Sequence, residues 1–225
     1  GHTYYGPIDG TNNSPDMPLY HALSNNLPAH IASHNGYLIS TGKTNFWHNE
    51  ENKLENTHGH SYHFDAHRVG QYFKKIVTAQ GCRHIDSEIT HVEVNDSGIQ
   101  SVELATGETI AADFFIDCTG FSRKLTTALG VDWISYKKHL PVDTAMPFLV
   151  DYKPGEHVEP VTTAWAQKAG WMWKIPTADR YGCGYVFDSR FITNEQAQEE
   201  IESALGHKIT PIRFLKFETG RLEKL

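Results

Sequence analysis

The chain has 225 residues, 39% of them hydrophobic and 12% aromatic, which is enough apolar bulk for one large globular domain or part of a bigger one. Its net charge of −7 comes from scattered acids and bases, which argues against a nucleic-acid interface, and its longest apolar runs, FFI and PFLV, are too short to span a membrane. No signal peptide opens the sequence and the cysteines form no C-x-x-C pair, so we expect reduced thiols and a cytoplasmic protein (Cys82, Cys118 and Cys183).

Residues 1–60 are rich in Asn, His, Pro and Gly and poor in periodicity, which predicts long surface loops. The stretch that follows, DAHRVGQYFKKIVTAQG, predicts an amphipathic helix with Asp65 as N-cap and Gly81 as C-cap. Its apolar positions share one helical face: Val69, Tyr72, Phe73, Ile76 and Val77.

Strand patterns follow this helix. ITHVEVND, SGIQSVELATG and ETIAADFFIDCTG predict strands that turns at NDSG and ATGE join into a meander, and FFIDCTG predicts a buried apolar strand that runs into a glycine turn. Strands are also predicted at residues 144–152, 158–176 and 180–188, and in ITPIRFLKFETG.

A second helix is predicted in TNEQAQEEIESALG, opened by a capping box of Thr193 and Gln196 and closed by Gly206. The order helix, strands, helix, strand predicts an α/β (mixed α+β) fold with one mixed sheet at its core.

FFIDCTGFSR is the first stretch that could carry chemistry. A strand that ends in small residues before a glycine lets the backbone approach a ligand, as at the carboxyl edge of dinucleotide-binding sheets. Many buried strands end in glycine merely to turn, and for this stretch alone a structural turn is the preferred interpretation.

The histidine-rich run HGHSYHFDAH is the second. His63 and His67 are four residues apart, a spacing that could place two imidazoles on one helix face as metal ligands. The pair straddles the predicted helix start, and no acidic or cysteine partner stands at a familiar spacing. Polar loop histidines, His58 and His60 among them, are therefore preferred to a metal site.

The third stretch is GWMWKIP, in which Trp171 and Trp173 would point to one face of a strand and Met172 to the other. Two indoles that fill a core are the default interpretation of an isolated W-x-W pair. The sequence has no nucleophile elbow, phosphate-binding glycine loop or zinc pattern. The residues alone therefore indicate an α/β protein, with an aromatic or planar cofactor as one hypothesis.

Four motifs together resemble the flavin-dependent tryptophan halogenases, in that family's order and at similar intervals: YHFDAH (62–67), FIDCTG (115–120), GWMWKIP (170–176) and RYGCGYVF (180–187). G-W-x-W-x-I-P is the family's fingerprint, and every fixed position is matched. The resemblance covers nearly the whole chain and is loosest in residues 1–60. It implies a partial FAD-binding fold of the glutathione-reductase type, shared with flavoprotein monooxygenases.

In that family, reduced flavin, dioxygen and halide give hypohalous acid, which travels through a tunnel to the organic substrate. The resemblance implies that Trp171 and Trp173 lie beside the flavin as a barrier to substrate, a role that suits large, stiff indoles. Ile175 and Pro176 would hold the end of that strand rigid. The alternative, that both indoles only pack, stays open.

The resemblance also implies cofactor contacts. FIDCTG looks like the third FAD-contact strand, so Thr119, Gly120 and Phe121 would lie near the pyrophosphate. Ile89 and Thr90, in SEIT, match by position the strand whose backbone meets the adenine.

Other family elements are missing. The amino-terminal G-x-G-x-x-G motif is absent, and the catalytic lysine and glutamate would fall before and after this sequence; Lys43 and Glu50 stand in the wrong context for those roles. We therefore expect residues 1–225 to be the central part of a single halogenase domain. Residues 1–60 would form a loop-rich excursion on the substrate side, and residues 61–225 the helix and mixed sheet.

A departure from the family concerns the substrate. The tryptophan halogenases typically carry a F-Y-H-P-F-like stretch whose histidine and phenylalanine sandwich the indole. Here Tyr5 and Pro7 match that stretch, whereas Gly6 and Ile8 stand where the histidine and phenylalanine would be. We expect a larger or differently substituted indole or phenol, with free tryptophan a poor substrate.

The resemblance thus predicts an FAD-dependent enzyme that chlorinates or brominates an electron-rich aromatic such as an indole. It would require a halide ion and a separate flavin reductase, and this segment alone would be inactive. The alternatives are an FAD-dependent aromatic hydroxylase of the same fold, which the intact W-x-W-x-I-P argues against, and a non-catalytic binding protein on the same scaffold. A homodimer stays open.

Overall fold

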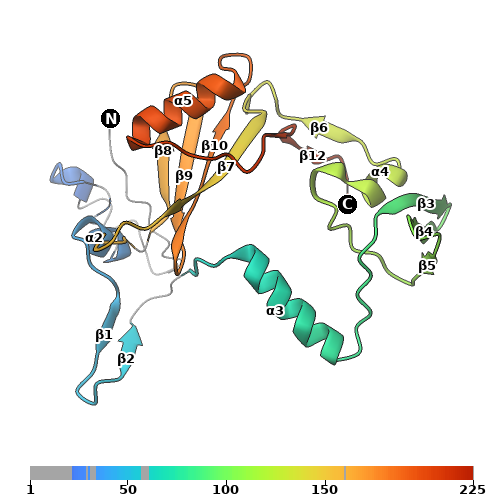
Figure 1. Cartoon of the computed structure of the whole chain (residues 1–225), viewed down its shortest axis with the longest axis horizontal. Helices are drawn as coiled ribbons and strands as arrows, with labels where there is room; N and C mark the ends of the chain where they lie inside the picture. The colour runs from blue at the N-terminus through green and yellow to red at the C-terminus, as the bar shows by residue number, and fades with distance from the viewer. Residues whose placement is uncertain (1–21, 29, 31–33, 57–60, 160, 225) are drawn as a thin grey trace. The chain divides into compact units, whose positions relative to one another are not determined.

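The computed structural model describes residues 22–28, 30, 34–56, 61–159 and 161–224 (Figure 1). They fall into two compact units. The first contains the described residues up to Phe64 with Asp151–Thr163 and Lys174–Tyr181, and the second contains the remaining described residues.

Helices separate runs of strands along the chain, as the mixed α+β prediction requires. The helices that lie wholly within the described residues are α2 (His34–Ser40), α3 (Ala66–Ala79), α4 (Lys124–Ala128) and α5 (Asn194–Leu205), with the 3-10 turn η2 (Gly120–Ser122) before α4. The strands are β1 (Phe46–His48), β2 (Leu54–Asn56), β3 (Ile89–Asn95), β4 (Gly98–Leu104), β5 (Thr109–Ala111), β6 (Trp133–Ser135), β7 (Thr144–Asp151), β8 (Thr163–Ala166), β9 (Gly170–Pro176), β10 (Arg180–Phe187), β11 (Leu215–Lys216) and β12 (Gly220–Leu222).

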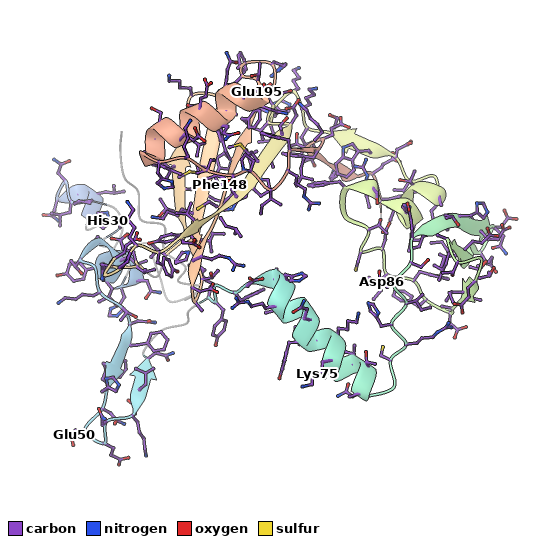
Figure 2. All side chains as sticks on the ribbon, in the orientation of Figure 1. His30, Glu50, Lys75, Asp86, Phe148 and Glu195 are labelled. Carbon is purple, nitrogen blue, oxygen red and sulfur yellow. The ribbon has the colours of Figure 1, made fainter. Side chains whose placement is uncertain are left out.

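The largest sheet has the order β11-β7-β10-β9-β8, and α5 covers one of its faces (Figure 1). On β10 every second residue, from Tyr181 to Phe187, is buried, which is the period-two pattern of a strand with one covered face. The Tyr185 hydroxyl donates to Glu200 of α5 over 2.9 Å. Phe148 of β7, labelled in Figure 2, is fully buried in the same core.

The predicted meander is confirmed as the antiparallel sheet β3-β4-β5. Asn95 pairs with Gly98 across the NDSG turn, and Leu104 begins the ATGE turn. Val102 and Leu104 are buried on one face of β4, where they form a small core with Leu125 of α4. Partly buried apolar residues surround that core: Ile85, Ile89, Val92, Ile99, Ile110 and Phe115.

Both predicted helices are confirmed with their N-caps and the C-cap Gly206, whereas the C-cap of α3 is Gln80 and not the predicted Gly81. The Asp65 carboxylate accepts from the backbone N–H groups of His67 and Arg68 at the start of α3, and Gly81, with φ +90°, follows the C-cap residue Gln80. The capping box of Thr193 opens α5 as expected, and Gly206 closes it with φ +74°.

The prediction of a buried strand at FFIDCTG is wrong. Residues 112–119 form no strand, and Phe114 and Ile116 are 80% and 75% exposed. A strand needs a neighbour for its backbone N–H and C=O groups, and no described strand pairs with this stretch. The apolar composition of FFIDCTG therefore predicted a buried strand, but the described residues do not bury this stretch.

Two further expectations need correction. ITPIRFLKFETG contains only the short β11, with β12 beginning at Gly220, and residues 158–176 divide into β8 and β9. The strands of the described residues also form four separate sheets instead of one mixed sheet. Short turns and loops interrupt these stretches where the apolar pattern alone suggested continuity. No described helix is both long enough and apolar enough to cross a membrane.

Candidate functional site

The tryptophan pair lies on the face of β9 opposite to its core residue. The ring centroids of Trp171 and Trp173 are 6.1 Å apart and the planes are tilted by 58°. Met172 points to the other face and is buried, whereas Trp171 remains 42% exposed. Met172, and not the indoles, therefore supplies the core contact of this strand, and core filling does not account for the pair.

A glycine on the neighbouring strand makes room for the second indole. A Cβ at Gly184 of β10 would lie only 2.0 Å from Cζ2 of Trp173, so the ring rests directly on the glycine backbone. A side chain at position 184 would therefore displace the indole or the strand. The glycine fixes where Trp173 sits, and Trp173 in turn borders Trp171.

The end of β9 is fixed by polar contacts. Pro176 is buried and Ile175 is half-buried. The next residue, Thr177, donates from both its N–H and its hydroxyl to the carbonyl of Arg180, which closes the turn into β10. The hydroxyl of Tyr152 donates to the Thr177 carbonyl. The geometry is compatible with the rigid strand end expected for Ile175 and Pro176.

The second candidate region is the turn DCTGFSR, which Asp117 organises. One carboxylate oxygen accepts from the N–H and hydroxyl of Thr119 at 3.0 and 2.6 Å. The other accepts from the N–H groups of Leu125 and Thr126 at 3.1 and 3.0 Å, and from the Thr126 hydroxyl. A single side chain thus ties the beginning of the turn to α4.

These hydrogen bonds also keep Asp117 ionised. Partial burial opposes the charged form, but donors on Thr119 and Thr126 outweigh it and lower the pKa of Asp117 to about 2. The carboxylate therefore carries its charge at every pH at which the protein would function, and the turn stays ordered around it.

The structure brings the predicted adenine strand and the predicted pyrophosphate turn together. Lys124 Nζ donates to the carbonyl of Ile89 over 2.7 Å and to the Glu88 carboxylate over 2.8 Å, while the Lys124 N–H donates to the Thr119 hydroxyl. Thr90 uses its hydroxyl to bond the Glu103 carbonyl on β4. Segments that are far apart in sequence are thus held next to each other by Lys124.

The other predicted contacts of this turn point outward. Gly120 has φ +63°, and a Cβ on it would meet nothing within 4 Å. Phe121 is 65% exposed and stacks on Phe217 with ring centroids 5.4 Å apart. The backbone around Gly120 is therefore open to approach, and Phe121 has a packing partner of its own.

Other predicted residues are not brought into a site. Tyr5, Gly6, Pro7 and Ile8 lie outside the described residues, as do His58 and His60. His63 bonds the hydroxyl of Thr162, and His67 in the first turn of α3 bonds Gln71. In the described part of the chain, no group of three or more His, Cys, Asp or Glu residues could hold a metal ion.

Sequence reasoning missed three residues that shape these regions. Asp117, Lys124 and Gly184 were not singled out, although each lies inside or beside a quoted motif. For Asp117 the available signal was an aspartate two residues before a threonine, a common turn-capping pattern. For Gly184 it was the alternation of glycines in RYGCGYVF, which leaves room on one strand face.

Comparison with known proteins decides the family. The family model described as "Tryptophan halogenase" matches residues 20–225, which is most of the chain. The chain belongs to the tryptophan halogenase family. The resemblance drawn from its four motifs is thereby confirmed, and so is the fold class, because solved flavin-dependent halogenases share this arrangement of helices and sheets.

Individual halogenases are similar over most of the chain. The tryptophan 7-halogenase RebH of Lentzea aerocolonigenes is 37% identical over 168 residues, which are 72% of this chain and 32% of RebH. The lathipeptide tryptophan 5-halogenase MibH has a TM-score of 0.85 and 27% identity, over 96% of this chain and 42% of its own. BrvH, a flavin-dependent halogenase from Brevundimonas sp. BAL3, has a TM-score of 0.79 and 27% identity, over 97% and 46%. The chain thus spans about a third of the length of the curated halogenases that it matches.

Proposed function

We propose that this halogenase-family chain forms part of an enzyme that uses FAD, dioxygen and a halide to chlorinate or brominate an electron-rich aromatic such as an indole. The observation that carries the proposal is the tryptophan pair of β9, held on the uncovered side of the strand instead of in the core. Membership of the family supplies the chemistry, and the pair supplies a residue-level reason to expect halogenation.

The pair suits a barrier. Two indoles at a centroid distance of 6.1 Å make a continuous apolar surface, and Trp173 cannot retreat because it rests on the Gly184 backbone. A rigid aromatic surface excludes both water and an organic substrate from the space behind it. Trp171 and Trp173 would thereby keep the aromatic substrate away from the flavin, so that oxygen is not transferred to it directly.

The turn around Gly120 fits a dinucleotide. Its backbone is open where a Cβ would meet no other atom, and Asp117 keeps it ordered. Thr119, Gly120 and Phe121 would approach the pyrophosphate of FAD, and Ile89 and Thr90 would approach the adenine. When bound, reduced FAD would supply the oxygen chemistry that turns halide into hypohalous acid.

The substrate is proposed to be an indole or phenol other than free tryptophan. The proposal rests on Gly6 and Ile8 in place of two flat side chains, which removes stacking surface and leaves space. MibH, by its title, acts on tryptophan in a lathipeptide, whereas RebH is a tryptophan 7-halogenase, so free and peptide-borne tryptophan both belong in a substrate panel.

The remaining features of the proposal concern the whole protein. Both compact units would belong to a single halogenase domain in the cytoplasm, with residues 1–60 on the substrate side. A separate flavin reductase would supply reduced FAD, and a homodimer is compatible with the sequence. Gel filtration measures the oligomeric state directly.

The test uses the longest protein that carries this sequence, with FAD, a flavin reductase, NADH, chloride or bromide, and a panel of indoles, phenols, tryptophan and tryptophan peptides. A product with the isotope pattern of chlorine or bromine supports the proposal. A hydroxylated product without halogen would support the aromatic hydroxylase, and flavin binding without any product would support the binding protein. If free tryptophan gives the highest kcat/KM, the substrate proposal is wrong while halogenation stands.

The role of the tryptophan pair is tested in the same assay with Trp171→Ala and Trp173→Ala. We expect less halogenated product per reduced flavin and some oxygenated product or released peroxide. Trp165→Ala is a matched control, because Trp165 of β8 is 44% exposed, close to the value for Trp171. If folded variants of the pair couple flavin oxidation to halogenation as well as the control does, the barrier role is wrong and both indoles only pack.

A further inference from the structure

Arg123 has an unusual backbone conformation for an arginine. It lies between η2 and α4 with φ 47° and ψ 43°, in the left-handed region. The other described residues with positive φ that are not glycine are Asn26 and Asn52, and asparagine tolerates this region. A long side chain held in this conformation costs free energy that the rest of the turn must offset.

Trp133 holds the Arg123 side chain in place. The guanidinium carbon lies 3.9 Å from the centroid of the Trp133 ring, a cation–π contact. The indole is itself fixed, because β6 pairs with β12 and a Cβ at Gly220 would lie 2.6 Å from Trp133 Nε1. That buried indole N–H has no hydrogen-bond partner among the described residues. Trp133 therefore interacts with Arg123 only through the face of its ring.

The edge of the guanidinium remains unused. Within the described ranges, the Arg123 side chain has neither an ion pair nor a hydrogen bond, although it is only partly exposed. The next residue behaves differently, since Lys124 bonds both the Glu88 carboxylate and the Ile89 carbonyl. Two adjacent cations of one turn therefore differ in their charge partners: the Glu88 carboxylate pairs with Lys124, and no described carboxylate pairs with Arg123.

A guanidinium fixed by its face and open at its edge is suited to a phosphate. Its N–H groups form a planar fork that matches two phosphate oxygens, and stacking reduces the entropy lost on binding. The negative charge nearest in sequence, on Asp117, is already surrounded by donors from Thr119, Leu125 and Thr126. Arg123 is thus the cation of this turn that is available to an incoming anion.

We propose that Arg123 is a phosphate-binding residue, stacked on Trp133 and presented beside the open backbone at Gly120. The ligand class is a phosphate ester or pyrophosphate. That the pyrophosphate belongs to FAD rests on the proposed function, whereas the recognition of phosphate rests on the geometry of Arg123 alone.

The experiment uses the 225-residue chain labelled with nitrogen-15 and follows the indole N–H resonance of Trp133, assigned with Trp133→Phe. Adenosine, ADP and inorganic pyrophosphate are titrated separately. We expect ADP and pyrophosphate to shift this resonance saturably at millimolar concentration, and adenosine to leave it unchanged because it lacks phosphate. An equal effect of adenosine, or no saturable shift with either phosphate compound, overturns the proposal.

Arg123→Gly is the decisive variant, because glycine relieves the left-handed backbone while it removes the guanidinium. We expect the affinity for ADP to fall by roughly 10- to 100-fold, the loss of a charge-assisted pair of hydrogen bonds. The affinity of Arg123→Lys for ADP should lie between those of Arg123→Gly and the unchanged chain, because lysine keeps the charge but not the planar fork of N–H groups. Arg83→Met, the matched control, removes an exposed arginine that pairs with Glu108, and its affinity for ADP should stay within about threefold of that of the unchanged chain. Binding of ADP to Arg123→Gly with unchanged affinity contradicts the proposal, and if that variant does not fold, unchanged affinity in Arg123→Lys contradicts it in the same way.

The two proposals can fail separately. If ADP binding depends on Arg123 but no halogenated product forms, the proposed function is wrong and the phosphate site stands. If the longer protein halogenates while Arg123→Gly binds FAD with unchanged affinity, the phosphate site is wrong and the proposed function stands.

Discussion

The sheet core under α5 buries its large apolar side chains, whereas α3 and the segment FFIDCTG leave most of theirs exposed. Phe148 and Phe187 of the sheet and Ile201 of α5 are fully buried. In the other region, Phe73 of α3 is 57% exposed and Phe114 is 80% exposed. Both regions follow sequence patterns that normally indicate a covered face.

The difference shows that an amphipathic pattern predicts an apolar face but does not predict which element packs on that face. α5 and most of the sheet belong to the same compact unit, in which Tyr185 of β10 bonds Glu200 of α5, so their apolar faces meet. No residue of α3 is buried among the described residues, although its predicted apolar face is formed. Four changes test whether stability follows this division.

The largest effect is expected from a cavity in the sheet core. Phe148→Ala should lower the free energy of unfolding by about 3–5 kcal/mol, because a fully buried aromatic ring is lost. Phe114→Ala, its control in the exposed region, should change that free energy by less than about 0.5 kcal/mol. Urea unfolding followed by circular dichroism measures both, and similar losses would show that the two regions are packed alike.

A more selective change is Gly184→Ala. The added methyl group would collide with Trp173, so we expect a loss of about 1–3 kcal/mol and an altered exciton signal of the tryptophan pair in circular dichroism. Gly70→Ala in α3 meets no atom within 4 Å and should instead stabilise that helix locally by about 0.5–1 kcal/mol, measured by its hydrogen exchange. A Gly184→Ala protein of unchanged stability and unchanged tryptophan signal contradicts the close contact of Trp173 with β10.

Helix caps sharpen the comparison further. Thr193→Ala removes the capping box of α5 and should cost about 1 kcal/mol of global stability, because α5 covers the core. Asp65→Ala removes the N-cap of α3, which buries no residue among those described, and should fray that helix without moving the urea midpoint. Hydrogen exchange of the first helical turns distinguishes local fraying from global loss; a shifted urea midpoint in Asp65→Ala would mean that α3 supports the core after all.

The smallest expected effect is on acid stability. Hydrogen bonds from Arg190 lower the pKa of the buried Asp188 from its ordinary 3.8 to about 2. Because the folded pKa is the lower one, this contribution to stability is present above about pH 4 and is lost as the pH falls toward 2. Asp188→Asn should therefore flatten the acid limb of the stability profile, measured as the urea midpoint against pH. Glu51→Gln, in an exposed ion pair with Lys53, should leave that limb unchanged.

The locally encoded parts of the fold were predictable. Asp65 and the capping box of Thr193 fix helix starts through hydrogen bonds within a few residues, and the meander turns lie where glycines and polar residues cluster. FFIDCTG was misread because its apolar run required a neighbouring strand, which is a non-local condition.

For the site, the motifs located the regions but not their organisation. The face shared by Trp171 and Trp173 follows from the two-residue period of a strand. That Lys124 would reach back to Ile89, or that Trp133 would stack on Arg123, depends on chain segments that meet only after folding. Residue type alone could not show that Lys124 pairs with a carboxylate of the chain, whereas no described carboxylate pairs with the neighbouring Arg123.

The sequence by itself determined the family, the helix caps, the meander and the shared face of the tryptophan pair, because these depend on short spacings and on the chemistry of single side chains. The tertiary structure decided that Met172 and not the tryptophans enters the core, and that Gly184 carries the ring of Trp173. It also decided that the guanidinium of Arg123 stacks on Trp133 and leaves its edge without a partner among the described residues. These outcomes depend on which strand or turn becomes the neighbour, and burial is a property of that neighbour as much as of the residue.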